Sequence, residues 1–264
     1  MPSQRSLQII NGLGFILVLV ANGLANGLPL NGYTTGQLSA LYPNLLVPAG
    51  FSFIIWGLIY FFLLGFVIFQ AEGLFSSKKA PEIVKLTGGW FFLSCMANGA
   101  WIFSWHYRLP GLAMLLMLFL LFCLIQVYRN LGPGVRSSDI WEKTWVHVPF
   151  SLYLGWISVA TLVNATALLV HWGWKGGGLP EEIWAAGMII VAGLLALLFL
   201  HRVYDWVYAM VIIWACYGIY HRHQFLMEEQ GSSLVITTTA AVAVLLLYRI
   251  GRLRLSQSGP QIYR

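Results

Sequence analysis

Long apolar stretches, repeated along nearly the whole chain, limit what this sequence can fold into. Each runs for roughly 17–25 residues, which is the length that an α-helix needs to cross the hydrocarbon core of a bilayer. Of the 264 residues 59% are hydrophobic and only 9% are charged, a composition far from that of a soluble domain. Most of the stretches also lack the polar stripe of a helix that faces water on one side. The sequence therefore predicts an all-α integral membrane protein.

About eight membrane-spanning helices can be placed on these stretches. Pro and Gly mark several of the breaks, as at Pro48, Pro110 and Pro180, because both residues interrupt helices. The first stretch is expected to remain as a membrane helix, since the residues after it make a poor signal-peptide cleavage site. The expected spans are 7–25, 51–70, 87–106, 110–128, 146–171, 183–200, 203–220 and 233–249.

The basic residues give these spans an orientation. Positively charged loops stay in the cytoplasm, and eight spans would put both termini on the side with twelve basic residues, against three on the other side. Both termini are therefore expected to face the cytoplasm, in the inner membrane if the protein is bacterial. The twelve are Arg5, Lys78, Lys79, Lys85, Arg129, Arg136, Lys143, Arg202, Arg249, Arg252, Arg254 and Arg264, and the three are Arg108, Lys175 and Arg222.

The segment 26–50 is the longest connection on the opposite side. It contains no Lys, Arg, Asp, Glu or His, but carries several Leu and Tyr residues and three Asn-Gly turns at or near its start. Such a segment has little reason to extend into water. We expect it to fold over the helices as a lid, with an ordinary turn-rich connector as the alternative.

Three motifs occur in order along the first two thirds of the chain. Pro43 and Pro48 are followed by Trp56 and Tyr60, in a pattern close to P-x3-P-P and W-x3-Y. A second motif, N-x-x-W, comprises Asn98 and Trp101. The third has the form Y-L-x-W-x-x-x-A-T-x-x-N and runs from Tyr153 through Trp156 and Ala160 to Asn164. Together these motifs resemble the TspO family, the tryptophan-rich sensory and translocator proteins, over about residues 7–172.

Helical spacing brings the motif residues toward one place. Asn98 and Trp101 share a stripe, as do Tyr153, Trp156, Ala160 and Asn164, and Trp56 and Tyr60 lie one turn apart on their own helix. Trp56, Asn98 and Asn164 lie roughly 10–12 Å below the outer surface at 1.5 Å per residue. Indole and phenol rings stack on planar ligands, and buried amides need hydrogen-bond partners. We expect a pocket for a flat apolar ligand between the helices 7–25, 51–70, 87–106 and 146–171, lined by Trp56, Tyr60, Asn98, Trp101, Tyr153, Trp156, Ala160 and Asn164.

The resemblance implies a sensor or receptor that binds tetrapyrroles such as protoporphyrin and haem, and it assigns ligand contacts to Trp56, Asn98, Trp156 and Ala160. It implies a five-helix bundle over residues 1–172, which leaves 173–264 as a three-helix extension with a basic cytoplasmic tail. Light-dependent porphyrin breakdown is an activity implied by the resemblance alone, and the sequence otherwise favours no enzyme. The site near 43–48 departs from the family, because Val47 replaces the first proline of a pair.

Other functions leave few traces. Acidic residues lie in or beside loops, with Asp205 closest to the interior, so a proton-coupled transporter is not favoured. No hydrolase, kinase or metal motif is present, and no cofactor is required. His106 and His171 are expected at the outer mouth of the site as interface residues, with coordination of haem iron by one of them as the alternative. The pair His221 and His223 is expected in a solvated loop.

The expected partners are the lipid bilayer and an apolar small molecule, with a homodimer left open and no nucleic acid. Two alternatives remain. One is a transporter or flippase of a lipid-like solute, and the other is a membrane assembly protein whose last three helices bind a partner.

Overall fold

The computed structural model describes residues 3–27, 30–75, 79–136, 138–227 and 230–257. Over these residues the regular secondary structure is helical throughout, without a strand, so the all-α prediction is confirmed. Lys78 and Arg264, two of the twelve basic residues counted above, lie outside the described residues. The elements are α1 (Gln4–Gly27), η1 (Leu30–Gly32), α2 (Thr35–Ala40), η2 (Gly50–Ile54), α3 (Ile55–Gln70), α4 (Ile83–Thr87), α5 (Trp90–His106), α6 (Pro110–Leu131), α7 (Ile140–Glu142), η3 (Lys143–His147), α8 (Val148–His171), η4 (Gly176–Gly178), α9 (Glu181–Val203), α10 (Trp206–His221), η5 (Arg222–Leu226) and α11 (Ser233–Gln257).

Local sequence signals account for several helix ends. Pro110 occupies the first turn of α6, where its missing N–H costs nothing. Gly132 ends the same helix in the left-handed conformation, with φ 61°. Tyr204 ends α9 with φ 55°, and the Asp205 side chain then caps α10 by accepting a hydrogen bond from the Tyr208 N–H at 3.0 Å. The corner between α9 and α10 therefore lies at Tyr204 and Asp205, just after the predicted position at His201 and Arg202.

Six helical stretches in the described part of the chain are long and apolar enough to cross a membrane: 4–25, 50–70, 110–131, 140–171, 181–203 and 233–255. Helices α5 and α10 fill two further predicted spans, but they have only 17 and 16 residues. At 1.5 Å per residue they are about 24–26 Å long, somewhat less than a hydrocarbon core of about 30 Å. The chain is thus an integral membrane protein by its helices, and the count of eight spans remains a prediction.

The helices pack in an order that joins the two predicted units. Helix α5 packs between α1 and α6, and α6 and α3 both pack on α8. Helix α10 lies against α8 and is flanked by α9 and α11, so α8 is the wall shared between the bundle and the extension. Gly155 of α8 permits close packing of α10, because a Cβ there would come within 3.0 Å of the Val211 Cβ. The division at residue 172 follows the end of α8 and remains a prediction.

A buried carboxylate also connects the bundle to the extension. Asp205 is only 7% exposed, and its Oδ2 accepts hydrogen bonds from the Tyr128 hydroxyl at 2.7 Å and the Ser151 hydroxyl at 2.6 Å. These donors come from α6 and α8, whereas Asp205 begins α10. A carboxylate is expensive to bury unless its oxygens are hydrogen-bonded, so this contact fixes the corner of the extension against both helices.

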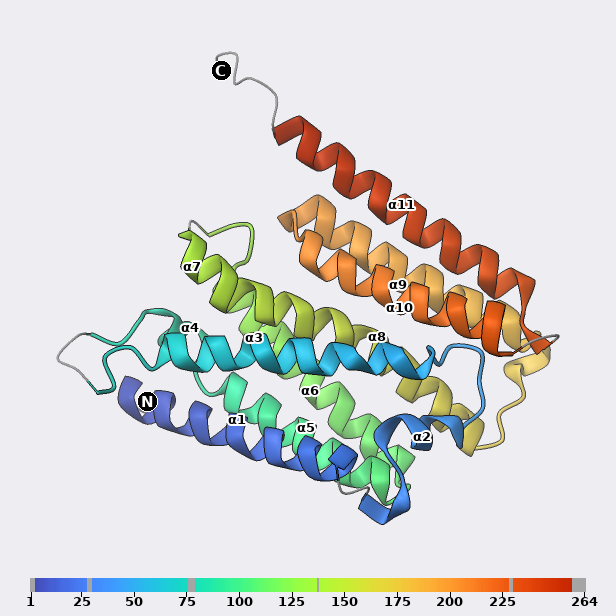
Figure 1. Cartoon of the computed structure of the whole chain (residues 1–264), viewed down its shortest axis with the longest axis horizontal. Helices are drawn as coiled ribbons and strands as arrows, with labels where there is room; N and C mark the ends of the chain where they lie inside the picture. Colours follow the sequence, from blue (N-terminus) through green and yellow to red (C-terminus); the bar gives the residue numbers. More distant parts are fainter. Residues whose placement is uncertain (1–2, 28–29, 76–78, 137, 228–229, 258–264) are drawn as a thin grey trace.

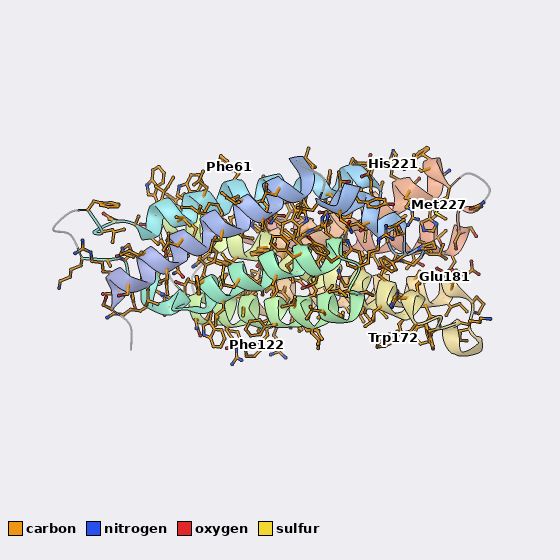
Figure 2. All side chains as sticks on the ribbon, turned by 90° about the horizontal axis from the view of Figure 1, so that it is seen from below. Phe61, Phe122, Trp172, Glu181, His221 and Met227 are labelled. Atoms are coloured by element: carbon orange, nitrogen blue, oxygen red, sulfur yellow. The ribbon has the colours of Figure 1, made fainter. Side chains whose placement is uncertain are left out.

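The outward surface of the bundle suits a lipid environment. Large apolar side chains are exposed along the helices, including Phe61 at 59%, Leu115 at 66% and Phe122 at 46%. Figure 2 shows Phe61 and Phe122 on opposite sides, whereas Trp172, Glu181 and His221 lie toward one end. The start of α1 and the end of α11 both lie toward the other end (Figure 1). Exposed apolar surface on this scale is unfavourable in water and is expected against acyl chains.

Candidate functional site

The segment that follows α1 folds back over one end of the bundle. Thr34 begins α2 with a capping box: its hydroxyl accepts from the Gln37 N–H at 3.3 Å, and the Gln37 side chain accepts from the Thr34 N–H at 2.8 Å. The next turn buries Leu38 completely, and Tyr42 packs its ring 5.4 Å from that of Trp105. We call the described residues from Leu30 to Pro48 the lid. The structure agrees with the prediction that this segment covers the helices.

His106 holds the first half of the lid. Its Nδ1 lies 2.9 Å from the Leu30 carbonyl oxygen, and because a carbonyl only accepts, Nδ1 donates. Its Nε2 lies 3.3 Å from the Thr35 hydroxyl, which can then act as the donor to a neutral ring. The Asn31 side chain donates to the His106 carbonyl at 3.0 Å. His106 is fully buried, so this predicted surface residue is an anchor of the lid.

An aromatic pocket lies directly below the lid. Its walls come from α3, α5 and α8, and its roof comes from the lid and η2. Trp101 and Trp105 are stacked, with centroids 6.0 Å apart, and the Trp156 ring meets Trp56 edge-on at 6.5 Å. The residues lining the pocket are Thr35, Ser39, Pro48, Phe53, Trp56, Trp101, Trp105, Trp156, Val159, Ala160, Val163 and Asn164.

The pocket is almost filled by its own side chains. The free volume is about 30 Å³, whereas pockets for drug-sized ligands usually have about 300–1,000 Å³. Phe53 accounts for part of the filling, because its ring lies 6.0 Å from Trp156. Any ligand larger than a water molecule must therefore move the lid, the indole rings, or both.

A second group of predicted site residues lies below this pocket, away from the lid. Tyr60 stacks on Trp56 with centroids 5.5 Å apart, and Tyr153 lies 5.9 Å from the same indole. Asn98 donates to the Tyr153 hydroxyl at 2.6 Å, and its Oδ1 accepts from the Asn22 side chain at 3.3 Å. These groups form a floor beneath the pocket lining. Asn98 bonds to Tyr153 and Asn22 across helices, whereas the Tyr60 hydroxyl has no hydrogen-bond partner among the described residues.

Of the eight predicted residues, the structure places Trp56, Trp101, Trp156, Ala160 and Asn164 in the pocket lining and the other three in its floor. Asn164 is bonded within the bundle, since its Oδ1 accepts from Trp101 Nε1 at 3.0 Å. The polar groups of the wall without a partner in the described residues are instead Trp105 Nε1 and Trp156 Nε1. Sequence reasoning missed Phe53 and the lid residues Thr35 and Ser39, which carry no motif.

The extension holds the second half of the lid. Arg222 Nη1 donates to the carbonyl oxygens of Asn44 and Val47, both at 2.9 Å. One carboxylate oxygen of Glu181 accepts from the Leu45 N–H at 3.2 Å. The Ala49 N–H, just past the lid, donates to the Gly218 carbonyl at 3.0 Å. Backbone carbonyls and amides in and just after the lid are thus paired with residues from α9, α10 and η5.

His223 completes this set of contacts. Its Nε2 donates to the Leu45 carbonyl at 2.8 Å, and its Nδ1 accepts from the Ser232 N–H at 3.1 Å. Burial lowers the pKa of the His223 imidazole below its ordinary value, and the neighbouring Arg222 charge lowers it further. The expectation that this histidine is solvated was wrong, because η5 is a π-helical turn that continues α10 and directs the side chain onto the lid. We call Arg222, His223 and Glu181 the latch.

Gly218 allows α10 to approach the lid closely. A Cβ at this position would lie 2.9 Å from the Pro48 Cβ and would clash with the Ser52 side chain. The indole of Trp214, one turn earlier, donates to the Ser52 carbonyl at 2.9 Å. Helix α10 therefore supports both the lid and the first turn of η2, which leads into the pocket residue Phe53.

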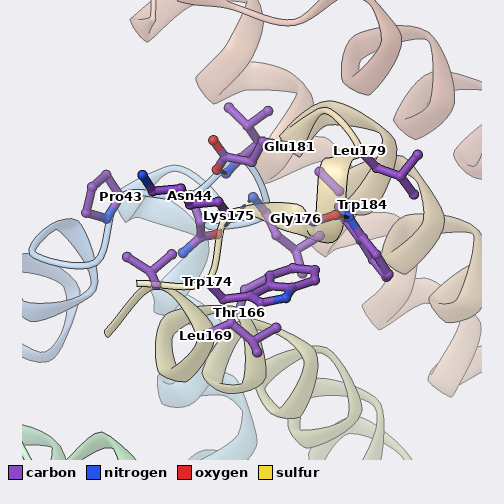
Figure 3. A pocket seen from close by; sticks show the side chains of 14 residues that line it. Pro43, Asn44, Thr166, Leu169, Trp174, Lys175, Gly176, Leu179, Glu181 and Trp184 are labelled. Atoms are coloured by element: carbon purple, nitrogen blue, oxygen red, sulfur yellow. Dashed lines mark hydrogen bonds between the residues drawn. The ribbon is translucent and has the colours of Figure 1, made fainter. Parts of the chain in front are cut away.

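A larger cavity of about 270 Å³ lies on the other side of the lid. The lid segment 43–46 forms one wall, and the end of α8, the η4 turn and the start of α9 form the others (Figure 3). Trp174 and Trp184 meet edge-to-face in it at 5.0 Å. This cavity does not include any of the eight predicted site residues.

These observations define a membrane-embedded helical bundle with an aromatic pocket closed by a lid. A family model described as "TSPO-like protein" matches residues 8–251. The chain belongs to the family of TSPO-like proteins, and the match runs through the extension as well as the bundle. The family indicates a protein of the membrane sensor or receptor kind. No curated protein and no solved structure matches the chain.

Proposed function

We propose that this protein is a membrane receptor that senses a tetrapyrrole, such as protoporphyrin, or a similarly flat apolar molecule in the aromatic pocket. The observation that carries the proposal is the convergence of Trp56, Trp101, Trp105 and Trp156 around the small side chain of Ala160. Indole rings offer large, rigid surfaces to a planar ring at low cost in side-chain entropy. The unpaired indole N–H groups of Trp105 and Trp156 are donors for polar atoms on the ligand.

The closed state of the pocket gives the proposal a mechanism. Only about 30 Å³ of the pocket is free, so the ligand enters when the lid moves away from the tryptophan side chains below it. The lid therefore has different conformations in the empty and the occupied protein. The latch connects the lid to η5 and α9, so occupation changes contacts at the extension. That coupling is what a sensor requires, since a ligand shifts a conformational equilibrium only by contacts that differ between two states.

A metal-free tetrapyrrole fits the histidines better than haem does. Both ring nitrogens of His106 are engaged by the lid, so this ring has no lone pair free for iron. His171 lies at the outer end of α8 with its ring 6.2 Å from Tyr42. We therefore expect protoporphyrin to bind at least as tightly as haem.

A transporter or flippase needs a path to both membrane faces. The floor below the pocket is occupied by Tyr60, Tyr153 and Asn98, with Asn98 and Tyr153 joined by a 2.6 Å hydrogen bond. The lid and latch control only one end of the bundle. The receptor proposal therefore accounts for more of the geometry.

Titration of protoporphyrin against tryptophan fluorescence tests the proposal. Ala160→Phe should fill the pocket and block binding, and Trp156→Leu should weaken it at least several-fold, because a lost aromatic stack is worth on the order of 1 kcal/mol beyond its area. Trp184→Leu, which lies outside the pocket, is the matched control. If Trp184→Leu weakens binding while the other two do not, the ligand binds elsewhere.

A further inference from the structure

The cavity between the lid and the extension has features of a separate ligand site. Its free volume of about 270 Å³ is close to the lower limit for small-molecule pockets and far larger than the space in the aromatic pocket. Leu169, Leu179 and Ala185 contribute apolar surface, and Trp174 and Trp184 contribute aromatic surface. Lys175 and Glu181 line the same cavity, and Figure 3 shows both near Trp174 and Trp184.

The wall of this cavity is built by an unusual turn. Gly176, Gly177 and Gly178 all have positive φ, at 77°, 58° and 88°, a conformation that side chains other than glycine rarely adopt. The turn returns the chain so that the Gly176 carbonyl accepts from Trp184 Nε1 at 2.9 Å. The polar atom of Trp184 is thereby satisfied, and its ring remains as an apolar wall.

The charges around the cavity are not balanced. Glu181 is already used by the latch: it accepts from the Leu45 N–H, and its negative charge faces Arg222 and His223. Lys175 lines the same cavity and forms no ion pair with any of the residues that the structure describes. The uncompensated charge is therefore positive, at the rim of an apolar cavity.

We propose that this cavity binds a small amphiphile, an apolar body carrying one anionic group, with Lys175 as the counter-ion and Trp174 and Trp184 against the apolar part. Carboxylate and phosphate groups both have this chemistry, so the molecule is either a free organic acid or an anionic lipid of the outer leaflet. The proposal does not depend on the tetrapyrrole site, because the two cavities share no lining residue. Its occupant would touch lid residues 43–46 and could stabilise the closed lid.

The test uses the full chain in phosphatidylcholine nanodiscs and 8-bromooctanoate, whose bromine quenches tryptophans that it contacts. We expect saturable quenching, with affinity reduced about three- to fivefold by Lys175→Gln, the scale of one partly exposed charge pair. Trp184→Leu should reduce the quenching amplitude. The neutral probe 8-bromooctanol should bind more weakly and should not respond to Lys175→Gln.

Arg108→Gln is the matched control, because it removes another cation expected at the same membrane face, one that lies over the Tyr33 ring at 5.1 Å. Equal weakening by both charge variants, or quenching that is linear and identical in all variants, would overturn the proposal. Nanodiscs with added phosphatidylglycerol identify the source. If phosphatidylglycerol competes with the probe, and this competition is lost in Lys175→Gln, the occupant is a lipid. If the affinity for the probe is unchanged by phosphatidylglycerol, the occupant is a free acid.

Discussion

The amide of Asn98 stabilises the fold, although the sequence resemblance predicted a ligand contact at this position. It is fully buried, donates to the Tyr153 hydroxyl and accepts from Asn22. Asn98→Leu leaves the Tyr153 hydroxyl without this bond in an apolar interior, so we expect a loss of about 1–3 kcal/mol in stability. Thermal unfolding in detergent measures it.

The matched control for this change is Asn130→Leu, because Asn130 donates a comparable bond to the Leu86 carbonyl at an exposed position. Water can replace that bond, so the control should lose less than about 1 kcal/mol. If the two variants are equally stable, the buried network around Asn98 contributes nothing specific.

We expect His223 to make the lid sensitive to pH. Its pKa is lowered in the folded protein, so the neutral ring contributes stability that is complete above the unfolded value of about 6.5 and is lost as the pH falls below it. Protonation of Nδ1 would place its N–H against the Ser232 N–H. It would also add a positive charge beside Arg222, which repels it, although the nearby Glu181 carboxylate attracts it. Limited proteolysis of the lid should therefore accelerate between pH 7.5 and 5.5.

His223→Gln tests this assignment, because a Gln side chain can donate to the Leu45 carbonyl and accept from the Ser232 N–H without titrating. The acceleration of lid proteolysis at low pH should be largely absent in this variant. An unchanged pH profile would mean that another group controls the lid.

Among the elements, η5 has the largest effect that the sequence did not reveal. Arg222 and His223 of η5 bond to lid residues that precede them by 175 to 178 positions in the chain. No local sequence pattern encodes contacts over that separation. The π-helical turn also changes the direction of Arg222 and His223 relative to an ordinary helix end. Spacing alone made these residues look like a polar loop.

The helices, and the helix faces that line the pocket, were predictable because they depend on local sequence patterns. Long apolar runs determine membrane helices, and the spacing of Trp156, Ala160 and Asn164 places them on one face whatever the neighbouring helices do. The near-complete filling of the pocket was not predictable. It depends on Phe53, which reaches Trp156 only because η2 bends the chain over the indole rings.

The latch should slow ligand entry. Arg222→Gln removes the two bonds to the Asn44 and Val47 carbonyls, so the lid opens more often and the association rate constant of protoporphyrin should rise several-fold in stopped-flow fluorescence. Arg202→Gln, an exposed cation at the other end of α9, should leave the rate unchanged. A slower rate for Arg222→Gln would show that the latch helps to form the entrance.

For the whole molecule, two observations predict a single orientation: the twelve-to-three distribution of basic residues, and the position of the start of α1 and the end of α11 toward the same end of the bundle. Reporter fusions after Arg129 and Arg264 should both be cytoplasmic, and a fusion after Lys175 should be external. An external C-terminus would exclude an even number of spans with a cytoplasmic N-terminus. Helix α10 would be the first to reconsider, because its 16 residues are fewer than a membrane crossing usually needs.

Hydrogen exchange along the lid, with and without saturating protoporphyrin, tests the central claim most directly. In the empty protein the amides of Leu45 and Ala49 should exchange slowly, because they are bonded to Glu181 and Gly218. Binding should change exchange throughout residues 30–49, since a ligand cannot occupy about 30 Å³ without moving the lid. Rapid exchange in the empty protein that saturating protoporphyrin leaves unchanged would contradict both the lid and the pocket beneath it.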